Sequence, residues 1–306
     1  MDLKNLENDY YGTKMLSVSS VKLFAQNPKR ALDDWQGKES WFADQSALTF
    51  GNYVHSGLQD ALENTNINHD KFVEKHPEMF KKDGTLYAKF IQADVCLNAI
   101  LKSSVFNGLL KASNNLKMLV EKAFASEYDG ISFKGKLDVC FIDKDNKKVH
   151  CIDFKTSKAY PQNGIDWGTL IDGQRDKCSV AWHVEKLFPM QAGVYRKLLQ
   201  DNGYSDFDID YTYIVVTKEA SPRIDVWNIT NEAMDKGLEL FLDNLVLAND
   251  YITGKQEAPI VYDDSAWAHK LTLKTPNKLV AEVMETEEEQ ENNLISNGKE
   301  MFAGVI

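Results

Sequence analysis

Two aspartates and a lysine lie on two neighbouring apolar segments of this chain. Asp138 falls in the segment 135–142, and Asp153 and Lys155 fall in the segment 149–156. The charged residues 143–147 separate the two segments, a pattern that predicts a β-hairpin. A buried carboxylate without a partner is costly, so such groups usually bind a metal or pair with a cation. We therefore predict a divalent-metal site, which is suited to the hydrolysis of a phosphodiester bond.

The spacing of Asp153 and Lys155 places both side chains on one face of their strand. The ammonium would then lie near a metal-bound water, where it could orient or help deprotonate that water and neutralise charge in the transition state. Mg²⁺ is the expected ion because it prefers carboxylate oxygens, and we expect Mn²⁺ to substitute. Its ligands would be Asp138, Asp153 and the backbone carbonyl of Ile152. The alternative is an ordinary salt bridge between Asp153 and Lys155.

The composition sets limits on the class of protein. The 306 residues include 43% hydrophobic residues, enough for one large domain or two small ones, and the net charge is -11. This charge argues against a surface coated for nonspecific DNA binding, but a metal site is itself acidic and permits a local basic channel. No apolar run approaches the roughly 20 residues of a membrane span, and no signal peptide is evident. We expect a cytoplasmic protein without membrane association.

The four cysteines are Cys96, Cys140, Cys151 and Cys178, and none forms a CxxC pair. Their spacing does not favour a zinc site or an iron–sulfur cluster. Cys140 and Cys151 would face each other across the hairpin, and a cytosolic compartment favours free thiols there. No Gly-x-x-x-x-Gly-Lys-Ser/Thr motif is present, so we expect no ATP dependence.

The periodicity of apolar residues predicts an α/β fold with a mixed central β-sheet flanked by helices. Helices are expected after an N-cap at Ser17 or Ser19, from Pro28 if Asn27 does not simply break the chain, and at about 45–63, 87–110, 189–199 and 231–251. Strands are expected as a meander from about 119 to 155, and at 211–217 and 223–227. We predict a single domain over 1–280, with a helical N-terminal part at about 1–115 and a core at about 116–255. The acidic segment 281–306 is expected to be a flexible tail.

Five motifs in this order resemble the PD-(D/E)XK nuclease superfamily, and most closely its RecE-like and RecB-like exonucleases of phage and bacterial recombination. The resemblance covers about residues 16–220. The family pattern is a helical Gly-x-x-x-His, a strand Glu, a Gly-x-x-Asp, an Asp/Glu-x-Lys and a helical Gln-x-x-x-Tyr. These motifs stand here as Gly51–His55, Glu121, Gly135–Asp138, Asp153–Lys155 and Gln191–Tyr195. Leu137 replaces the proline that names the superfamily, which RecB-like members commonly lack.

The resemblance extends the predicted site beyond the hairpin. It implies that Glu121 acts with Asp138, Asp153 and Lys155 in catalysis and contacts the metal directly or through water. Glu127 is a weaker candidate for the same position. The resemblance also makes His55 a metal ligand or a phosphate contact, although a lone helical histidine is often a structural residue.

A second group of residues is expected to bind the substrate. Gln191 and Tyr195 share one helical face, and the resemblance implies that this face positions a DNA strand. Alternatively, Tyr195 belongs to the core and Gln191 is a cap. A 5′-phosphate pocket needs basic residues, and arginine binds phosphate through two hydrogen bonds. Lys29, Arg30 and Arg175 are the candidates.

The resemblance implies a Mg²⁺-dependent exodeoxyribonuclease that degrades one strand of linear double-stranded DNA from 5′ to 3′. The 3′ single-stranded tails would serve phage-type homologous recombination by single-strand annealing in a bacterial host cell. A ring-shaped homo-oligomer and an annealing protein as partner are expected with it, and an iron–sulfur cluster is not. Two alternatives remain, namely a structure- or sequence-specific endonuclease of the same fold, and a non-catalytic module that binds DNA or protein.

Overall fold

The structure is a computed structural model that describes residues 6, 9–38, 46–113, 116–157, 170–171, 174–175 and 188–260. The chain divides into two compact units, Met1–Pro259 and Ile260–Ile306, and every element below belongs to the first. The predicted boundary at residue 280 and the predicted tail over 281–306 lie outside the described residues. No helix in the described ranges has the length and apolar character needed to cross a membrane.

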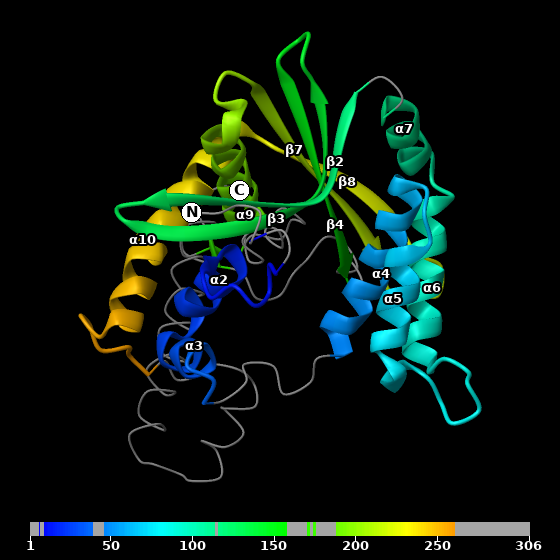
Figure 1. Ribbon diagram of the computed structural model, residues 1–306, viewed down its shortest axis with the longest axis horizontal. Helices are drawn as coiled ribbons and strands as arrows, with labels where there is room; N and C mark the ends of the chain where they lie inside the picture. The colour runs from blue at the N-terminus through cyan, green and yellow to red at the C-terminus, as the bar shows by residue number, and fades with distance from the viewer. Residues whose placement is uncertain are drawn as a thin grey trace, which may run out of the picture. The chain divides into compact units, whose positions relative to one another are not determined.

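A six-stranded mixed sheet forms the centre of the first unit (Figure 1). Its strands are β1 (Leu16–Ser17), β2 (Lys117–Tyr128), β3 (Ile131–Asp143), β4 (Lys148–Ser157), β7 (Asp208–Thr217) and β8 (Ile224–Ile229). Their order is β1-β3-β4-β7-β8, with β2 also paired to β3. The β1–β3 and β4–β7 pairs are parallel and the others are antiparallel, which confirms the predicted mixed sheet. Two short strands, β5 (Leu170–Ile171) and β6 (Gln174–Arg175), pair separately.

Helices cover both faces of this sheet (Figure 1). The layer on one face consists of α2 (Val18–Gln26), α3 (Pro28–Trp35), α9 (Phe188–Leu199) and α10 (Asn231–Thr253). The layer on the other face consists of α4 (Ser46–Glu63), α5 (Ile67–Lys75), α6 (Ala88–Leu101) and α7 (Ser104–Ser113). Short helical turns lie at Pro77–Met79 and Gln200–Tyr204.

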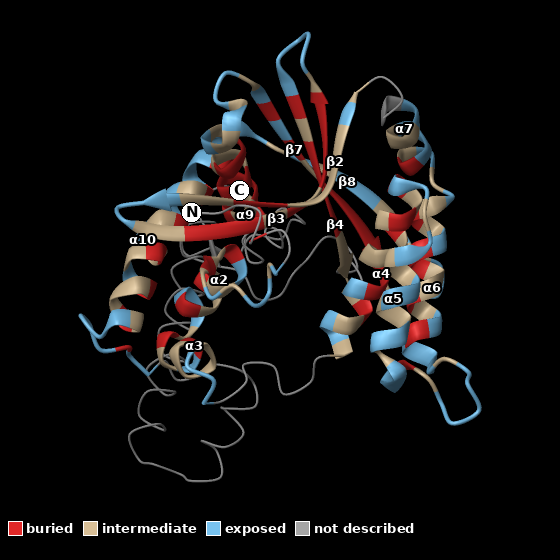
Figure 2. Cartoon of the chain, in the orientation of Figure 1, coloured by how far each residue is buried: buried red, intermediate tan, exposed pale blue. Residues whose placement is uncertain are grey.

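Burial on both faces explains the apolar run in β7. Tyr211 and Tyr213 pack into the core under α9 and α10, and Ile214 and Val216 pack into the core under α4 and α6. A strand covered on both sides carries apolar residues at successive positions rather than at alternate ones. Figure 2 shows the buried residues concentrated on the strands and on the helix faces turned toward them.

Local signals set several element boundaries as predicted. The Ser17 side chain caps α2 in a reciprocal arrangement with Ser20. Asn27 ends α2 and caps α3, which begins at Pro28. The turn Asp129-Gly130 joins β2 to β3 with positive φ at both residues, as tight hairpin turns require.

One predicted apolar stretch, 87–110, forms two helices rather than one. Ser103 accepts a hydrogen bond from the backbone N–H of Phe106 through its Oγ atom (3.1 Å). A serine in this position competes for backbone donors and begins a new helix, so α6 ends at Leu101 and α7 begins at Ser104.

Two glycines bring α9 and α10 into backbone contact. A Cβ atom on Gly193 would lie 2.2 Å from the carbonyl oxygen of Met234, and one on Gly237 would lie 2.2 Å from that of Pro189. Neither position has room for a side chain, so this contact fixes how closely α9 lies against α10.

Candidate metal centre

The site begins with a gap along one edge of β3. Strand β2 pairs with β3 from Ile131 to Ile142, except at Asp138, and so lies along the whole of one edge. On the opposite edge, β1 pairs as far as Lys134 and β4 pairs from Val139 onward. In the part of the chain that the structure describes, no strand pairs with this edge over 135–138. Asp138 therefore lies where β4 diverges from β3.

At this point the side chains of both β2 and β3 switch the face of the sheet to which they point. Leu119 and Phe124 pack into the same core although their positions differ by an odd number, and so do Leu137 and Cys140. Residues at odd spacing face opposite sides of a regular strand. The alternation thus reverses around Glu121, where the φ angle is 49° and the ladder is interrupted. Such backbone strain concentrates at functional sites.

Three potential metal ligands converge at the irregularity. One ligand atom each from His55, Glu121 and Asp138 lies within 4.8 Å of the other two. The Nδ1 atom of His55 is 3.4 Å from Oδ2 of Asp138, and that oxygen also accepts the N–H of Phe154 at 2.9 Å. An imidazole with two carboxylates is a suitable donor set for a divalent cation such as Mg²⁺ or Mn²⁺.

Gly51 lies one helical turn before His55 in α4, on the side of the helix that approaches β4. A Cβ atom at Gly51 would be 4.0 Å from Oγ1 of Thr156 at the end of β4, an ordinary contact distance. The Gly-x-x-x-His motif therefore lies where α4 meets the end of β4, although the space at Gly51 does not itself require glycine.

The electrostatics of Asp138 favour the binding of a cation. Burial raises the pKa of Asp138 to about 7, nearby His55 opposes this shift, and the carboxylates of Asp153 and Glu121 add to it. A carboxyl group in this condition binds either a proton or a cation near neutral pH. The residues present thus fit a bound divalent ion.

Asp153 is held firmly beside this cluster, with its side chain only 1% exposed. Its Oδ2 atom accepts hydrogen bonds from Nε2 of Gln191 and from the hydroxyl of Tyr211 (3.1 Å). Its Oδ1 atom forms an ion pair with Lys155 and has no hydrogen-bond partner of suitable geometry in the described ranges. The side chain is therefore fixed through one oxygen, while the other faces the lysine.

Lys155 remains charged in this setting. Burial by itself would lower the pKa of the Lys155 ammonium, but the carboxylates of Asp153 and Asp138 outweigh it and raise the pKa above its ordinary value. The amine is also 5.7 Å from the centre of the Tyr213 ring. In this state the lysine can stabilise negative charge and orient water.

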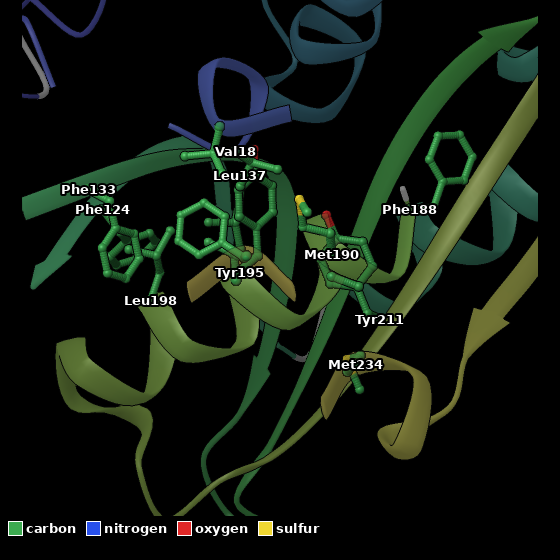
Figure 3. Close-up of a cluster of buried hydrophobic side chains, with 14 of the residues drawn as sticks. Val18, Phe124, Phe133, Leu137, Phe188, Met190, Tyr195, Leu198, Tyr211 and Met234 are labelled. Atoms are coloured by element: carbon green, nitrogen blue, oxygen red, sulfur yellow. The ribbon is translucent and has the colours of Figure 1, made fainter. Parts of the chain in front are cut away.

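Helix α9 supplies the two residues of the Gln-x-x-x-Tyr motif, with different placements. Gln191 donates to Asp153 and so lies at the site. Tyr195 lies in the core, 8% exposed, where its ring packs beside Leu137 (Figure 3). A Cβ atom on Gly135 would be 2.6 Å from this ring, so the glycine of Gly-x-x-Asp makes room for the tyrosine.

Three further predicted residues, Ile152, Lys29 and Arg30, have defined places in the fold. The backbone of Ile152 pairs with Val139, next to Asp138, and its side chain enters the core under α4. Lys29 forms an ion pair with Asp33 at 2.5 Å within α3. The backbone N–H of Arg30 donates to the capping residue Asn27, and its side chain is exposed.

Two further candidates can be placed only in outline. Arg175 lies in β6, paired with Leu170, and its side chain is outside the described part of the structure. Glu127 is exposed and pairs with Ser132 near the hairpin turn, so it is not part of the cluster at Glu121.

Sequence reasoning missed Lys22, which approaches the site from α2. Burial lowers the pKa of this lysine to about 7, nearby Lys155 lowers it further, and Asp153 opposes the shift. Lys22 follows the buried Val18 by one helical turn, so it belongs to the face that packs on the sheet. A lysine on the apolar face of a short helix was the signal that could have revealed it.

The two buried cysteines of the hairpin face each other as predicted. Cys140 pairs with Cys151 in the β3–β4 register, with the sulfurs 3.2 Å apart, and both are free thiols. Cys178 lies outside the described residues.

Comparisons with known proteins agree with this architecture. The profile of a PDDEXK-like domain of unknown function (DUF3799) matches residues 17–261. The crystal structure of a "putative exonuclease" from Eubacterium rectale matches with a TM-score of 0.63 and 18% identity, over 88% of this chain and 92% of that one. A second crystal structure, of SSO0001, gives a TM-score of 0.27 and 16% identity over 76% of this chain and 86% of that one. A search of curated proteins gave no match.

Proposed function

The chain belongs to the PDDEXK-like family DUF3799, and from this premise we propose that it is a divalent-metal-dependent exodeoxyribonuclease. The main support is the convergence of His55, Glu121 and Asp138 on the gap beside β3, next to the Asp153–Lys155 pair. Acidic ligands beside a fixed ammonium form a site suited to the hydrolysis of a phosphodiester bond.

Each residue has a distinct part in this proposal. His55, Glu121, Asp138 and Asp153 would hold Mg²⁺ or Mn²⁺, with the carbonyl of Ile152 as a further ligand. The bound ion would supply charge neutralisation at the phosphate and an activated water.

The protein's own groups position the reaction. Lys155, kept as an ammonium by Asp153 and Asp138, would stabilise the charge that develops on the phosphate oxygens. Gln191 and Tyr211 would keep Asp153 in one orientation through their hydrogen bonds to its Oδ2 atom. Lys22 approaches from the same side of the sheet, and with a pKa of about 7 it is only partly charged near neutral pH.

The finer features of the proposal rest on the resemblance to RecE-like exonucleases. They are degradation from 5′ to 3′, a ring-shaped oligomer that encloses the duplex, and a single-strand annealing protein as partner. The naming of the Eubacterium rectale protein as a "putative exonuclease" supports a proposal of action at DNA ends. Phosphate contacts from Lys29, Arg30 or Arg175 and strand contacts from Tyr195 are part of the same proposal.

The first test uses linear duplexes labelled at one 5′ end or one 3′ end, and a covalently closed circle of the same sequence. We expect Mg²⁺-dependent release of the 5′ label as mononucleotides and an intact circle. Cleavage of the circle would favour an endonuclease of the same fold. Binding without cleavage under any divalent ion would favour a non-catalytic module.

The second test removes the ammonium. Lys155→Ala is expected to lower kcat/KM by roughly 10²- to 10³-fold, because it removes a group that stabilises transition-state charge. Asp153→Ala is expected to abolish cleavage as well. The matched control is Lys148→Ala, since Lys148 is the exposed first residue of the same strand. Wild-type cleavage in folded Lys155→Ala protein would refute the assignment of the site.

A further inference from the structure

A cavity of about 390 Å³ lies beside the metal centre. Asp9, Tyr10, Tyr11, Lys122 and Lys136 line it together with Glu121. Glu121 is also a member of the metal-ligand cluster, so the cavity and the cluster share a wall. Under the proposed function, an occupant of the cavity would lie next to the reacting phosphate.

The segment that carries the two tyrosines is anchored to the sheet. Lys134 on β3 donates to the carbonyl oxygens of Tyr10 and Thr13, the latter at 2.7 Å. The N–H of Gly12 donates to Oδ1 of Asp9 at 2.8 Å and closes a turn between them. The aromatic wall therefore has a defined position relative to β3.

The ring of Tyr11 is exposed to solvent, and the ring of Tyr10 beside it is half-buried. They meet edge to face, with centroids 5.3 Å apart and planes at 90°. Tyr11 is 80% exposed. The ammonium of Lys136 lies 5.4 Å from the centre of the Tyr11 ring and forms an ion pair with Glu121. Lys136 thus links the exposed ring to the metal-ligand cluster.

The charges of the lining select the type of occupant. Two lysines and two carboxylates line the cavity, so it has no excess of positive charge to hold a phosphate. An exposed aromatic ring stacks on any nucleobase, because every base has a π-face. The carboxylates and ammonium groups offer acceptors and donors to the edge of a base. The volume falls in the range of small-molecule sites, about 300–1,000 Å³.

We propose that this cavity receives a nucleobase that flanks the scissile phosphate and that Tyr11 stacks on it. This inference rests on the proposed function, because it takes the metal centre as the place where the phosphate lies. The contact is independent of sequence, since stacking tolerates every base.

The experiment is a double cycle that removes either the ring or the base. Binding of a fluorescein-labelled linear duplex is measured by anisotropy in Ca²⁺ for the wild type, Tyr11→Ala, Tyr11→Trp and the control Tyr87→Ala, whose exposed ring belongs to the α5–α6 region. Two further duplexes carry an abasic residue at the first or the second nucleotide of the end. Thermal unfolding confirms that each variant is folded.

We expect Tyr11→Ala to weaken binding of the intact duplex roughly 5- to 150-fold, with little change in Tyr11→Trp and Tyr87→Ala. One abasic duplex should bind the wild type as weakly as the intact duplex binds Tyr11→Ala, with no further loss in the variant. Two results would overturn the proposal. One is an affinity of Tyr11→Ala within twofold of the wild type. The other is that the fold-losses in affinity from removing the ring and from removing the base multiply when both are removed. The abasic arm uses the wild-type chain, so it does not depend on a variant's folding.

Cleavage of the same intact duplex in Mg²⁺ separates the two proposals. If the wild type cleaves and Tyr11→Ala binds DNA normally, the nucleobase site is refuted and the nuclease proposal stands. If the wild type never cleaves, but removing the ring and the base together weakens binding no more than removing one of them, the nuclease proposal is refuted and the nucleobase site stands.

Discussion

At the scale of single residues, the site depends on how the protein treats buried carboxylates. Asp153 contacts three side chains, with two hydrogen bonds at Oδ2 and an ion pair at Oδ1. Asp138 has the backbone N–H of Phe154 and the imidazole of His55. Burial together with neighbouring negative charge leaves Asp138 with a pKa near 7. Without a cation, ionised Asp138 is therefore a cost to the folded state.

The pKa of Asp138 predicts a pH-dependent gain in stability for Asp138→Asn. The folded-state pKa lies above the unfolded value of 3.8, so the stability contributed by protonated Asp138 is present below about pH 4 and lost as the pH rises through about 7. In metal-free buffer we expect the variant to unfold at a higher urea concentration than the wild type at pH 8. The gain is on the order of 4 kcal/mol and should vanish near pH 4.

Asp143→Asn is the control for this experiment, at the partly exposed last residue of the same strand. Hydrogen bonds from Asn146 lower the pKa of Asp143, so its stabilising contribution is present above the unfolded pKa and lost as the pH falls. The stability gained by Asp138→Asn should therefore grow as the pH rises. The stability lost by Asp143→Asn should shrink as the pH falls. If the difference in urea midpoint between Asp138→Asn and the wild type is the same at every pH, the proposed electrostatics of Asp138 are wrong.

At the scale of elements, local patterns predicted most of the helices and strands. The capped start at Ser17, the Asp129-Gly130 turn and the apolar run of β7 each arise from short-range rules, and the structure confirms them. The strand bearing Asp153 and Lys155 was also predicted, because both residues lie on one short segment. Their mutual contact follows from strand geometry alone.

Features that depend on tertiary packing were not predicted. The reversed alternation at Glu121 has no local signal, since a non-glycine residue with positive φ is held there by its surroundings. The approach of Lys22 depends on how α2 packs against the sheet. The cavity at Tyr10 and Tyr11 requires the N-terminal segment to lie along the β2–β3 hairpin, a contact between distant parts of the sequence.

The α9–α10 contact offers a prediction at this scale. Gly237→Ala would place a methyl group 2.2 Å from the carbonyl oxygen of Pro189, so α9 must shift. We expect a loss of about 1–3 kcal/mol in the free energy of unfolding, as for overpacked cores. Activity should fall as well, because Gln191 on α9 would move away from Asp153.

Gly108→Ala is the matched control, since Gly108 lies in α7 and a Cβ atom there would meet nothing within 4 Å. Alanine is the better helix former, so this variant should gain about 0.5–1 kcal/mol. Urea unfolding measures both changes. Equal stability of the two variants would show that the close α9–α10 contact is not required.

At the scale of the whole first unit, the centre gathers groups from both helical layers. His55 comes from α4 on one face of the sheet, and Gln191 and Lys22 come from α9 and α2 on the other. The gap beside β3 is where these groups meet the strand carboxylates. A cation bound there would connect one layer with the strands that support the other, so its binding energy becomes folding stability.

This linkage predicts that Mn²⁺ raises the melting temperature of the protein at pH 8. An ion at 100 times its Kd adds about 2.7 kcal/mol, which corresponds to roughly 5–10 °C for a unit of this size. Glu121→Gln should lose most of this shift, whereas Glu127→Gln, six residues further along the same strand and exposed, should keep it. The shift should also shrink at pH 6, because a proton competes for Asp138 below a pKa of about 7. The same melting temperature with and without Mn²⁺, at concentrations up to several millimolar, would mean that the cluster at the gap does not bind a divalent ion.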